Sequence, residues 1–187
     1  LFINNATYSP VLIVTGKCGS DTSIAHLQIY PVPLTPTISD TTICIGTSVT
    51  LNASAPGEKY EWFDKPNGTL LKVGNGFKTP ILTTNTTYYV QSTLFDCSSP
   101  LKAVVVKIKP VPLPPTVTTD TICAGETAVL TATGPAGVRI EWFSTITGGV
   151  MWDSVPVYIT PPLNTNTSYF AQTQLNGCTS IRVKATV

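Results

Sequence analysis

An internal repeat with a period of about 80 residues constrains this chain more than any other feature. The tripeptide Glu-Trp-Phe at 61–63 returns at 141–143, and one cysteine precedes each copy while another follows it. Corresponding residues are 79 apart at the first cysteine (44 and 123), 80 at the tryptophan (62 and 142) and 81 at the second cysteine (97 and 178). A fixed period of this length indicates an array of similar domains.

The first part of the chain matches only the end of the repeat. Ile24–Tyr30 corresponds to Ala103–Lys109, and Pro-Val-Pro follows both segments. We therefore predict a partial domain at 1–32 (last two strands only) and complete domains at 33–111 and 112–187. Because two strands alone do not bury a core, the chain is expected to be a piece of a longer protein. Proline fixes φ and removes backbone donors, so the Pro-Val-Pro connections should be stiff.

Composition favours strands over helices. Charged residues make up 11% of the chain, about half the usual share, and threonine, valine and proline are abundant. Short alternating segments with turn residues between them predict an all-β chain of tandem immunoglobulin-like sandwiches, arranged as a rod. The net charge is +1 and no basic cluster is present, so nucleic acid is not expected as a partner. No motif for a cofactor is found.

Alternation within the strands predicts the core. In the first complete domain we expect strands near 35–40, 47–54, 58–64, 69–73, 77–82, 86–94 and 101–109. Trp62 and its counterpart Trp142 then face the core, as a tryptophan on the third strand does in immunoglobulin-like domains. Tyr88 and Tyr169 are placed where a tyrosine corner would close the sixth strand.

Four short motifs together carry a family resemblance. Each repeat contains Ile-Cys-x-Gly (43–46 and 122–125), Trp-Phe, Thr-Asn-Thr-x-Tyr followed by an aromatic residue (84–89 and 165–170), and a second cysteine. This set resembles the Ig-like tandem repeats of Bacteroidetes cell-surface adhesins, including gliding-motility adhesins, which are exported by the type IX secretion machinery.

The resemblance implies a non-catalytic spacer or stalk in a large extracellular adhesin or surface filament. Its partners would be neighbouring repeats of the same long chain, other copies in a filament, and surface glycans. The alternative is a carbohydrate-binding or spacer module attached to a secreted polysaccharide-degrading enzyme. The resemblance also implies O-glycosylation at Asp-(Ser/Thr)-(aliphatic or Thr) sequences, which makes Thr41, Thr121 and Ser154 candidate sites.

Five cysteines at repeating positions indicate an oxidising, extracellular compartment. The default pairing is within each repeat, Cys44 with Cys97 and Cys123 with Cys178, which leaves Cys18 with a partner outside the fragment. Strand parity favours a different pairing, because the turn before the second strand and the last hairpin lie at opposite ends of a seven-stranded sandwich. If domains follow one another end to end, Cys44 would instead meet Cys178. Both pairings remain open at this point.

No residue set indicates catalysis or a metal. His26 is the single histidine, and its expected place is an outward strand face. Glu61, Asp64 and Glu141 do not form an acid pair, because Glu61 and Glu141 are equivalent residues of separate domains. We expect them on solvated strand faces.

Aromatic side chains are the remaining candidates for binding. Trp152 has no aromatic counterpart in the first repeat, and with Tyr158 it would form a platform for carbohydrate; a local core contact is the simpler expectation. Phe63 and Phe143, on the face opposite the core tryptophan, would contact a neighbour.

Overall fold

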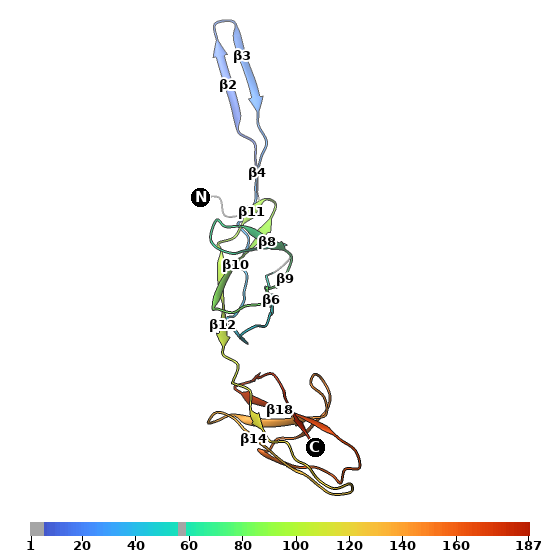
Figure 1. Ribbon diagram of the computed structural model, residues 1–187. Coiled ribbons are helices and arrows are strands. Elements are labelled where there is room, and N and C mark those ends of the chain that lie inside the picture. Colours follow the sequence, from blue (N-terminus) through green and yellow to red (C-terminus); the bar gives the residue numbers. More distant parts are fainter. Residues whose placement is uncertain (1–5, 56–58) are drawn as a thin grey trace. The chain divides into compact units, whose positions relative to one another are not determined.

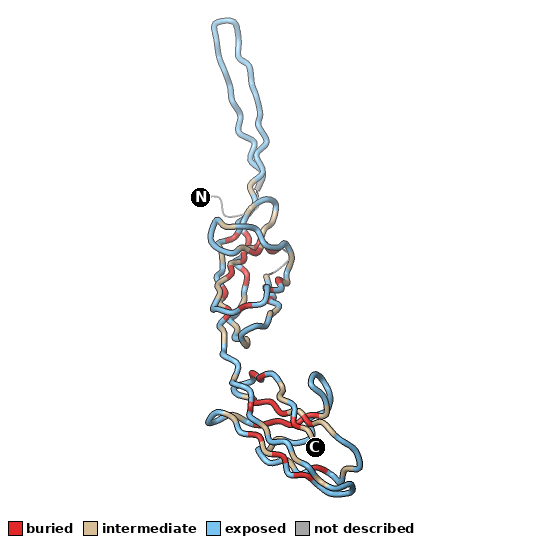
Figure 2. Tube along the Cα trace, in the orientation of Figure 1, coloured by how far each residue is buried: buried red, intermediate tan, exposed pale blue. Residues whose placement is uncertain are grey.

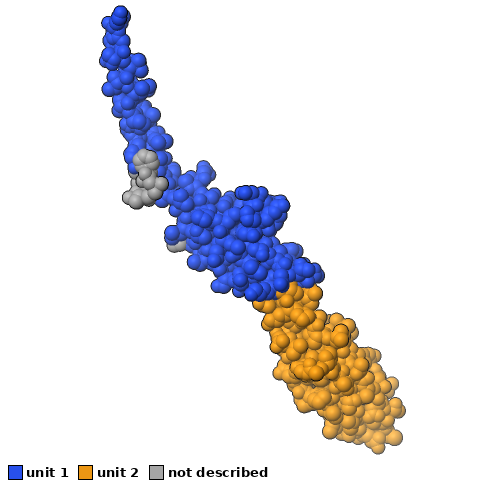
Figure 3. Space-filling model, turned by 90° about the vertical axis from the view of Figure 1, so that its left-hand side faces the viewer, with its two compact units in different colours: residues 1–41, 48–107 blue, residues 42–47, 108–187 orange. Residues whose placement is uncertain are grey.

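The computed structural model describes residues 6–55 and 59–187, and within these ranges every regular element is a β-strand (Figure 1). Residues 1–5 of the expected partial domain, and residue 58 of one expected strand, lie outside the described residues. The chain divides into two compact units, residues 1–41 with 48–107 and residues 42–47 with 108–187 (Figure 3). None of the described segments forms a helix long and apolar enough to cross a membrane.

The chain begins with an exposed antiparallel ribbon in unit 1. Strand β1 (Ala6–Tyr8) pairs with β4 (Leu27–Ile29), and β2 (Val11–Gly16) pairs with β3 (Gly19–Ile24). Every residue of β2 and β3 is exposed (Figure 2). Leu27 in β4 has no core to face here, and its side chain is 51% exposed.

The first complete repeat is a two-layer sandwich. Its larger sheet has the strand order β5-β12-β10-β7-β8, with the short β11 paired to β10, and its smaller sheet pairs β6 with β9. The strands are β5 (Thr41–Cys44), β6 (Thr50–Asn52), β7 (Lys59–Phe63), β8 (Leu70–Val73), β9 (Gly76–Lys78), β10 (Thr86–Leu94), β11 (Cys97–Ser98) and β12 (Lys102–Lys109). Six of the seven expected strands have counterparts at or near the expected places. The expected strand at 35–40 is wrong, because that segment makes only an isolated bridge at Thr37, and β5 forms at Thr41–Cys44 instead.

Trp62 lies at the centre of the first core and is fully buried. Its ring stacks on Phe77 with centroids 5.6 Å apart, and its indole Nε1–H donates to the Gly74 carbonyl oxygen at 2.8 Å. That bond gives the one polar atom of the tryptophan a partner inside the core. Tyr88 is also buried, and its ring meets Phe77 edge-on at 5.0 Å.

The second repeat, in unit 2, has the same two layers. One sheet has the order β16-β15-β18-β19 with β20 paired to β18, and the other has the order β13-β14-β17. The strands are β13 (Thr116–Val117), β14 (Val129–Thr133), β15 (Arg139–Phe143), β16 (Met151–Asp153), β17 (Val157–Ile159), β18 (Ser168–Leu175), β19 (Cys178–Thr179) and β20 (Val183–Thr186).

The second core repeats the first and extends it with one more ring. Trp142 is fully buried and donates from Nε1 to the Val155 carbonyl oxygen at 3.0 Å, and Tyr169 is buried beside it. Trp152 stacks on Tyr158 at 6.0 Å and meets Tyr169 edge-on at 5.1 Å, yet stays 43% exposed. The odd tryptophan of the sequence is therefore an outer layer of the core.

The buried tyrosines predict a loss of stability at alkaline pH. Burial raises the pKa of Tyr88 above the ordinary value of about 10. Burial, and to a smaller extent the nearby Tyr158, also raises the pKa of Tyr169. The folded protein then keeps phenol protons that the unfolded chain releases, so this contribution is complete below pH 10 and is lost as pH rises through the folded pKa. Urea titrations at stepwise higher pH, with absorbance at 295 nm, measure it; Tyr169→Phe should flatten the dependence, and an unchanged slope would contradict it.

Candidate functional site

Each repeat has a cysteine turn just before its second major strand. In residues 44–47 the Thr47 amide donates to the Cys44 carbonyl oxygen at 3.2 Å, and in residues 123–126 the Glu126 amide donates to the Cys123 carbonyl oxygen at 3.1 Å. The third residue is a glycine in both turns, with φ of 79° at Gly46 and 87° at Gly125. A type II turn requires positive φ at that position, which explains the Cys-x-Gly spacing.

Each complete repeat also has a cysteine hairpin near its end. Leu94 pairs with Cys97 across the first hairpin, and Leu175 pairs with Cys178 across the second. Both central residues of each two-residue loop have positive φ, as type I′ hairpin turns require; these are Phe95 and Asp96 in the first loop, and Asn176 and Gly177 in the second. The hairpins are therefore equivalent in register and in turn geometry.

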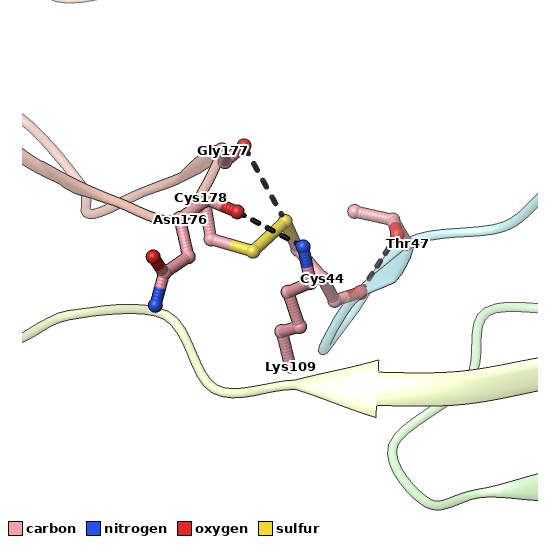
Figure 4. The surroundings of a disulfide bond; sticks show 6 residues. All are labelled: Cys44, Thr47, Lys109, Asn176, Gly177 and Cys178. Atoms are coloured by element: carbon pink, nitrogen blue, oxygen red, sulfur yellow. Dashed lines mark hydrogen bonds between the residues drawn. A yellow bond between two sulfur atoms is a disulfide. The ribbon is translucent and has the colours of Figure 1, made fainter. Parts of the chain in front are cut away.

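A disulfide joins the first cysteine turn to the second cysteine hairpin. Cys44 is bonded to Cys178, with Cα atoms 5.7 Å apart and a sequence separation of 134 (Figure 4). Both cysteines belong to unit 2, because residues 42–47 group with 108–187. Around the bond, the Lys109 ammonium donates to the Asn176 carbonyl oxygen at 3.1 Å, and Cys44 Sγ lies 3.7 Å from the Gly177 carbonyl oxygen. The Ile45 amide donates to the Lys109 carbonyl oxygen at 2.8 Å.

The default pairing within each repeat is therefore corrected. Cys97 and Cys123 carry free thiols, as does Cys18 in the two-residue loop between β2 and β3. The second repeat shows the physical reason. The Cys123 turn is tied to Leu163 just before β18, since the Gly125 amide donates to the Leu163 carbonyl oxygen at 2.8 Å, whereas Cys178 follows the far end of that eight-residue strand. At about 3.3 Å per residue the two sulfurs are more than about 20 Å apart, well beyond the reach of a disulfide.

The candidate glycosylation sites differ in access. Thr121 is exposed, while Thr41 in β5 and Ser154 are half-buried. The preceding aspartates have structural contacts: Asp40 accepts the Val105 amide at 2.9 Å, and Asp120 accepts the Thr121 amide at 2.8 Å. Thr121 is therefore the most exposed of the three candidates.

The expectation of a solvated face is wrong for Glu141. This carboxylate is 5% exposed; it accepts a hydrogen bond from Gln172 Nε2 at 2.8 Å and forms an ion pair with Arg139. Glu61 has the equivalent bond from Gln91 Nε2 at 2.9 Å but is only half-buried. Asp64 is exposed and accepts the Thr69 amide at 2.8 Å. Each of these three carboxylates thus accepts a hydrogen bond from its own sheet or loop, and the three do not come together at one site.

Arg182 covers the outer face of the second repeat, and nothing in the sequence marks it for this role. Its guanidinium carbon lies 3.4 Å from the centre of the Phe143 ring, and its Nη1 donates to the Thr145 and Gly148 carbonyl oxygens, each at 2.6 Å. Burial lowers the pKa of Arg182, and the Glu141 carboxylate opposes that shift. Phe143 is consequently buried, whereas Phe63 is half-buried.

This network supports a comparison between matched variants. Gln172→Leu removes the donor to a buried carboxylate and the acceptor for Arg182 Nε at 3.1 Å, so the free energy of unfolding should fall by about 2 kcal/mol. Gln91→Leu is the control, with an expected loss under about 1 kcal/mol, because water reaches the half-buried Glu61. Urea denaturation followed by circular dichroism measures both, and equal losses would contradict the role of burial.

No metal centre is present among the described residues, where no three ligating side chains come together. His26 is exposed, and its Nδ1 lies 3.1 Å from Ser9 Oγ. That contact is a local hydrogen bond between the two breaks of the ribbon, the one between β1 and β2 and the one between β3 and β4.

Two successive sandwiches, each with two sheets and a buried central tryptophan, define tandem immunoglobulin-like domains. One disulfide, between Cys44 and Cys178, accompanies them. The model of the family described as "Ig-like domain CHU_C associated" matches residues 33–110 and again 112–187, so the chain belongs to that family. The resemblance to Ig-like tandem repeats is thereby confirmed. An Ig-like domain with a disulfide also indicates an extracellular or secreted protein.

Solved structures offer distant likenesses, and no curated protein matches the chain. A crystal structure of DIP-gamma IG1+IG2 is 14% identical, with a TM-score of 0.38 and coverage of 83% of this chain and 96% of that one. A crystal structure of chicken CNTN1 FN1–FN3 domains is 12% identical, with a TM-score of 0.42 and coverage of 99% and 76%. At these values neither adds to the family assignment.

Proposed function

We propose that the chain is a structural spacer, a stalk segment of a large repeat adhesin or filament at the cell surface, and that it is not catalytic. The disulfide carries this proposal. It ties residues of two successive sequence repeats together over 134 positions, which suits a segment that transmits force between its ends. The partners are then neighbouring repeats of the same chain and other copies in a filament, with export through the type IX secretion machinery.

Two further observations support a spacer. Proline-rich connections at 31–33 and 110–112 limit φ between successive segments. The carboxylates that would serve an enzyme are occupied, with Glu61 and Glu141 each accepting a hydrogen bond from a glutamine of the adjacent strand. Glycosylation at Thr121, and at Thr41 and Ser154 where access allows, would make this segment a glycoprotein.

A carbohydrate-binding module is the second candidate, and the exposed Trp152 is the observation that favours it. The remaining aromatic groups weaken this candidate. One face of the Trp152 ring is stacked on Tyr158, the corresponding place in the first repeat holds an aliphatic Leu71, and Phe143 is covered by Arg182. A glycan-binding face repeated in both domains is therefore not formed.

Single-molecule pulling from the two ends tests the spacer. The oxidised chain should extend by about 450 Å less than the reduced chain, because the segment between two cysteines with a sequence separation of 134, at about 3.4 Å for each position, stays outside the force path. Equal extension of both forms would show that the bond carries no force. A glycan array with the wild-type chain and Trp152→Ala tests the alternative: glycan binding lost in Trp152→Ala would favour the binding module over the spacer.

A further inference from the structure

The Cys123 turn is a second copy of a turn that is already bonded. It shares with the Cys44 turn the hydrogen bond from the fourth residue to the cysteine carbonyl oxygen, and the positive φ of the glycine between them. Cys44 has the Cys178 hairpin as its covalent partner, whereas Cys123 is an exposed free thiol. The two turns therefore share their backbone geometry, and they differ in that Cys44 is bonded and ends strand β5 whereas Cys123 is free and follows no strand.

An open cleft adjoins Cys123. The residues around it include Asp120, Thr121, Cys123, Asn164, Asn166 and Val187, and because Val187 is the last residue of the sequence, the place that residues 107–109 fill beside the Cys44 turn is open here. At the Cys44 turn, the end of β12 and a type I′ hairpin fill the corresponding surroundings. The Lys109 carbonyl oxygen accepts the Ile45 amide, the Lys109 ammonium donates to the Asn176 carbonyl oxygen of the hairpin, and the Gly177 carbonyl oxygen lies 3.7 Å from Cys44 Sγ. A cysteine turn of this kind therefore contacts a cysteine hairpin.

We propose that the Cys123 turn is a docking site for the cysteine hairpin of an Ig-like repeat that follows in tandem, with a disulfide from Cys123 to the hairpin cysteine. The Cys97 hairpin, equivalent to that of Cys178, is the matching half and bonds the cysteine turn of a preceding repeat. Successive repeats are then locked one to the next throughout the array. This site goes beyond the spacer function, because it would serve an array of binding modules equally well.

The bond requires an oxidant, which we take to be a small-molecule disulfide such as oxidised glutathione. The Cys123 thiolate attacks that disulfide, forms a mixed disulfide and releases one glutathione thiolate. The hairpin thiolate then displaces the second glutathione. Two protein thiols lose two electrons and two protons, and one oxidised glutathione becomes two reduced molecules.

The register of the last strands supplies the design of the test. Tyr88 pairs with Val104 and Tyr169 with Ala185, so Val106 and Val187 hold equivalent positions. Appending a second copy of residues 107–187 after Val187 therefore reproduces the natural connection between repeats while keeping the full chain. The extended chain is refolded in a glutathione buffer, its free thiols are alkylated, and intact mass with peptide mapping counts the disulfides.

The expected result is one disulfide more than in the chain without the extension, from Cys123 to the appended hairpin cysteine, beside Cys44–Cys178. In the extended chain, Cys123→Ser should remove the additional bond and leave Cys44–Cys178 in place. The matched Cys97→Ser should retain both bonds.

Three outcomes would overturn the proposal. In the first, Cys44–Cys178 forms while Cys123 is alkylated. In the second, Cys123 is linked to a different molecule instead of the appended repeat. In the third, neither bond forms, which would remove the pattern on which the inference is based. Glycan binding or equal extension under force would contradict the spacer function without changing these thiol counts, so the two proposals fail separately.

Discussion

Trp142→Ala should lower the free energy of unfolding of the second repeat by about 3–5 kcal/mol. The indole is fully buried, contacts the Tyr158 ring at 5.8 Å and donates to the Val155 carbonyl oxygen, so its removal leaves both a cavity and an unsatisfied acceptor. A loss of this size is a large part of the stability of a small domain. Urea denaturation with hydrogen exchange on β15 and β18 peptides would measure the change where it occurs.

Trp152→Ala is the matched control for that substitution. It removes the same side chain from a site that is 43% exposed, where the ring gains contacts with Tyr158 and Tyr169 but fills no closed space. The expected loss is about 1 kcal/mol. Equal losses for the two tryptophans would show that the second core is not centred on Trp142.

Cys44→Ser should lower the free energy of unfolding by about 2–4 kcal/mol. The bond that it removes closes a loop of 134 positions, and a constraint of this length restricts the unfolded chain strongly in the chain-entropy model. The bond also holds Cys44 within reach of the Cys178 hairpin, so hydrogen exchange at residues 42–47 and 176–178 should accelerate. Urea denaturation under oxidising conditions would measure the change in stability.

Two comparisons distinguish the effect of losing the disulfide from the effect of replacing a cysteine side chain. In reducing buffer the wild-type chain should match Cys44→Ser, because both then lack the disulfide. Cys97→Ser should be nearly neutral in either buffer, since that half-buried thiol has no covalent partner. If Cys97→Ser were as destabilising as Cys44→Ser, the pairing with Cys178 would be contradicted.

Much of the fold could be read from local patterns. Period-two alternation located strands such as Thr86–Leu94 and placed Trp62 toward the core, because a pleated strand alternates its side chains between two faces. The spacing Cys-x-Gly corresponds to a turn with positive φ at Gly46 and Gly125. Such signals work because they depend on a few adjacent residues.

Contacts between distant residues were harder to predict. Solvation of Glu141 was the wrong expectation because Arg139, Gln172 and Arg182 cover that face, and alternation along one strand does not reveal what its outer face meets. The aromatic Trp152 was ambiguous for the same reason, until its stacking on Tyr158 showed it to be a core layer.

The sequence by itself determined the repeat, the all-β class, the family and the cysteines that hold equivalent positions, since each of these is a local pattern or a comparison of local patterns. Only the tertiary structure decided which cysteines bond. Cys44 has the same sequence relation to Cys97 that Cys123 has to Cys178, so sequence spacing favoured a pairing within each repeat. A disulfide depends on the distance between Cα atoms, and that distance is 5.7 Å between Cys44 and Cys178, two residues separated by 134 positions.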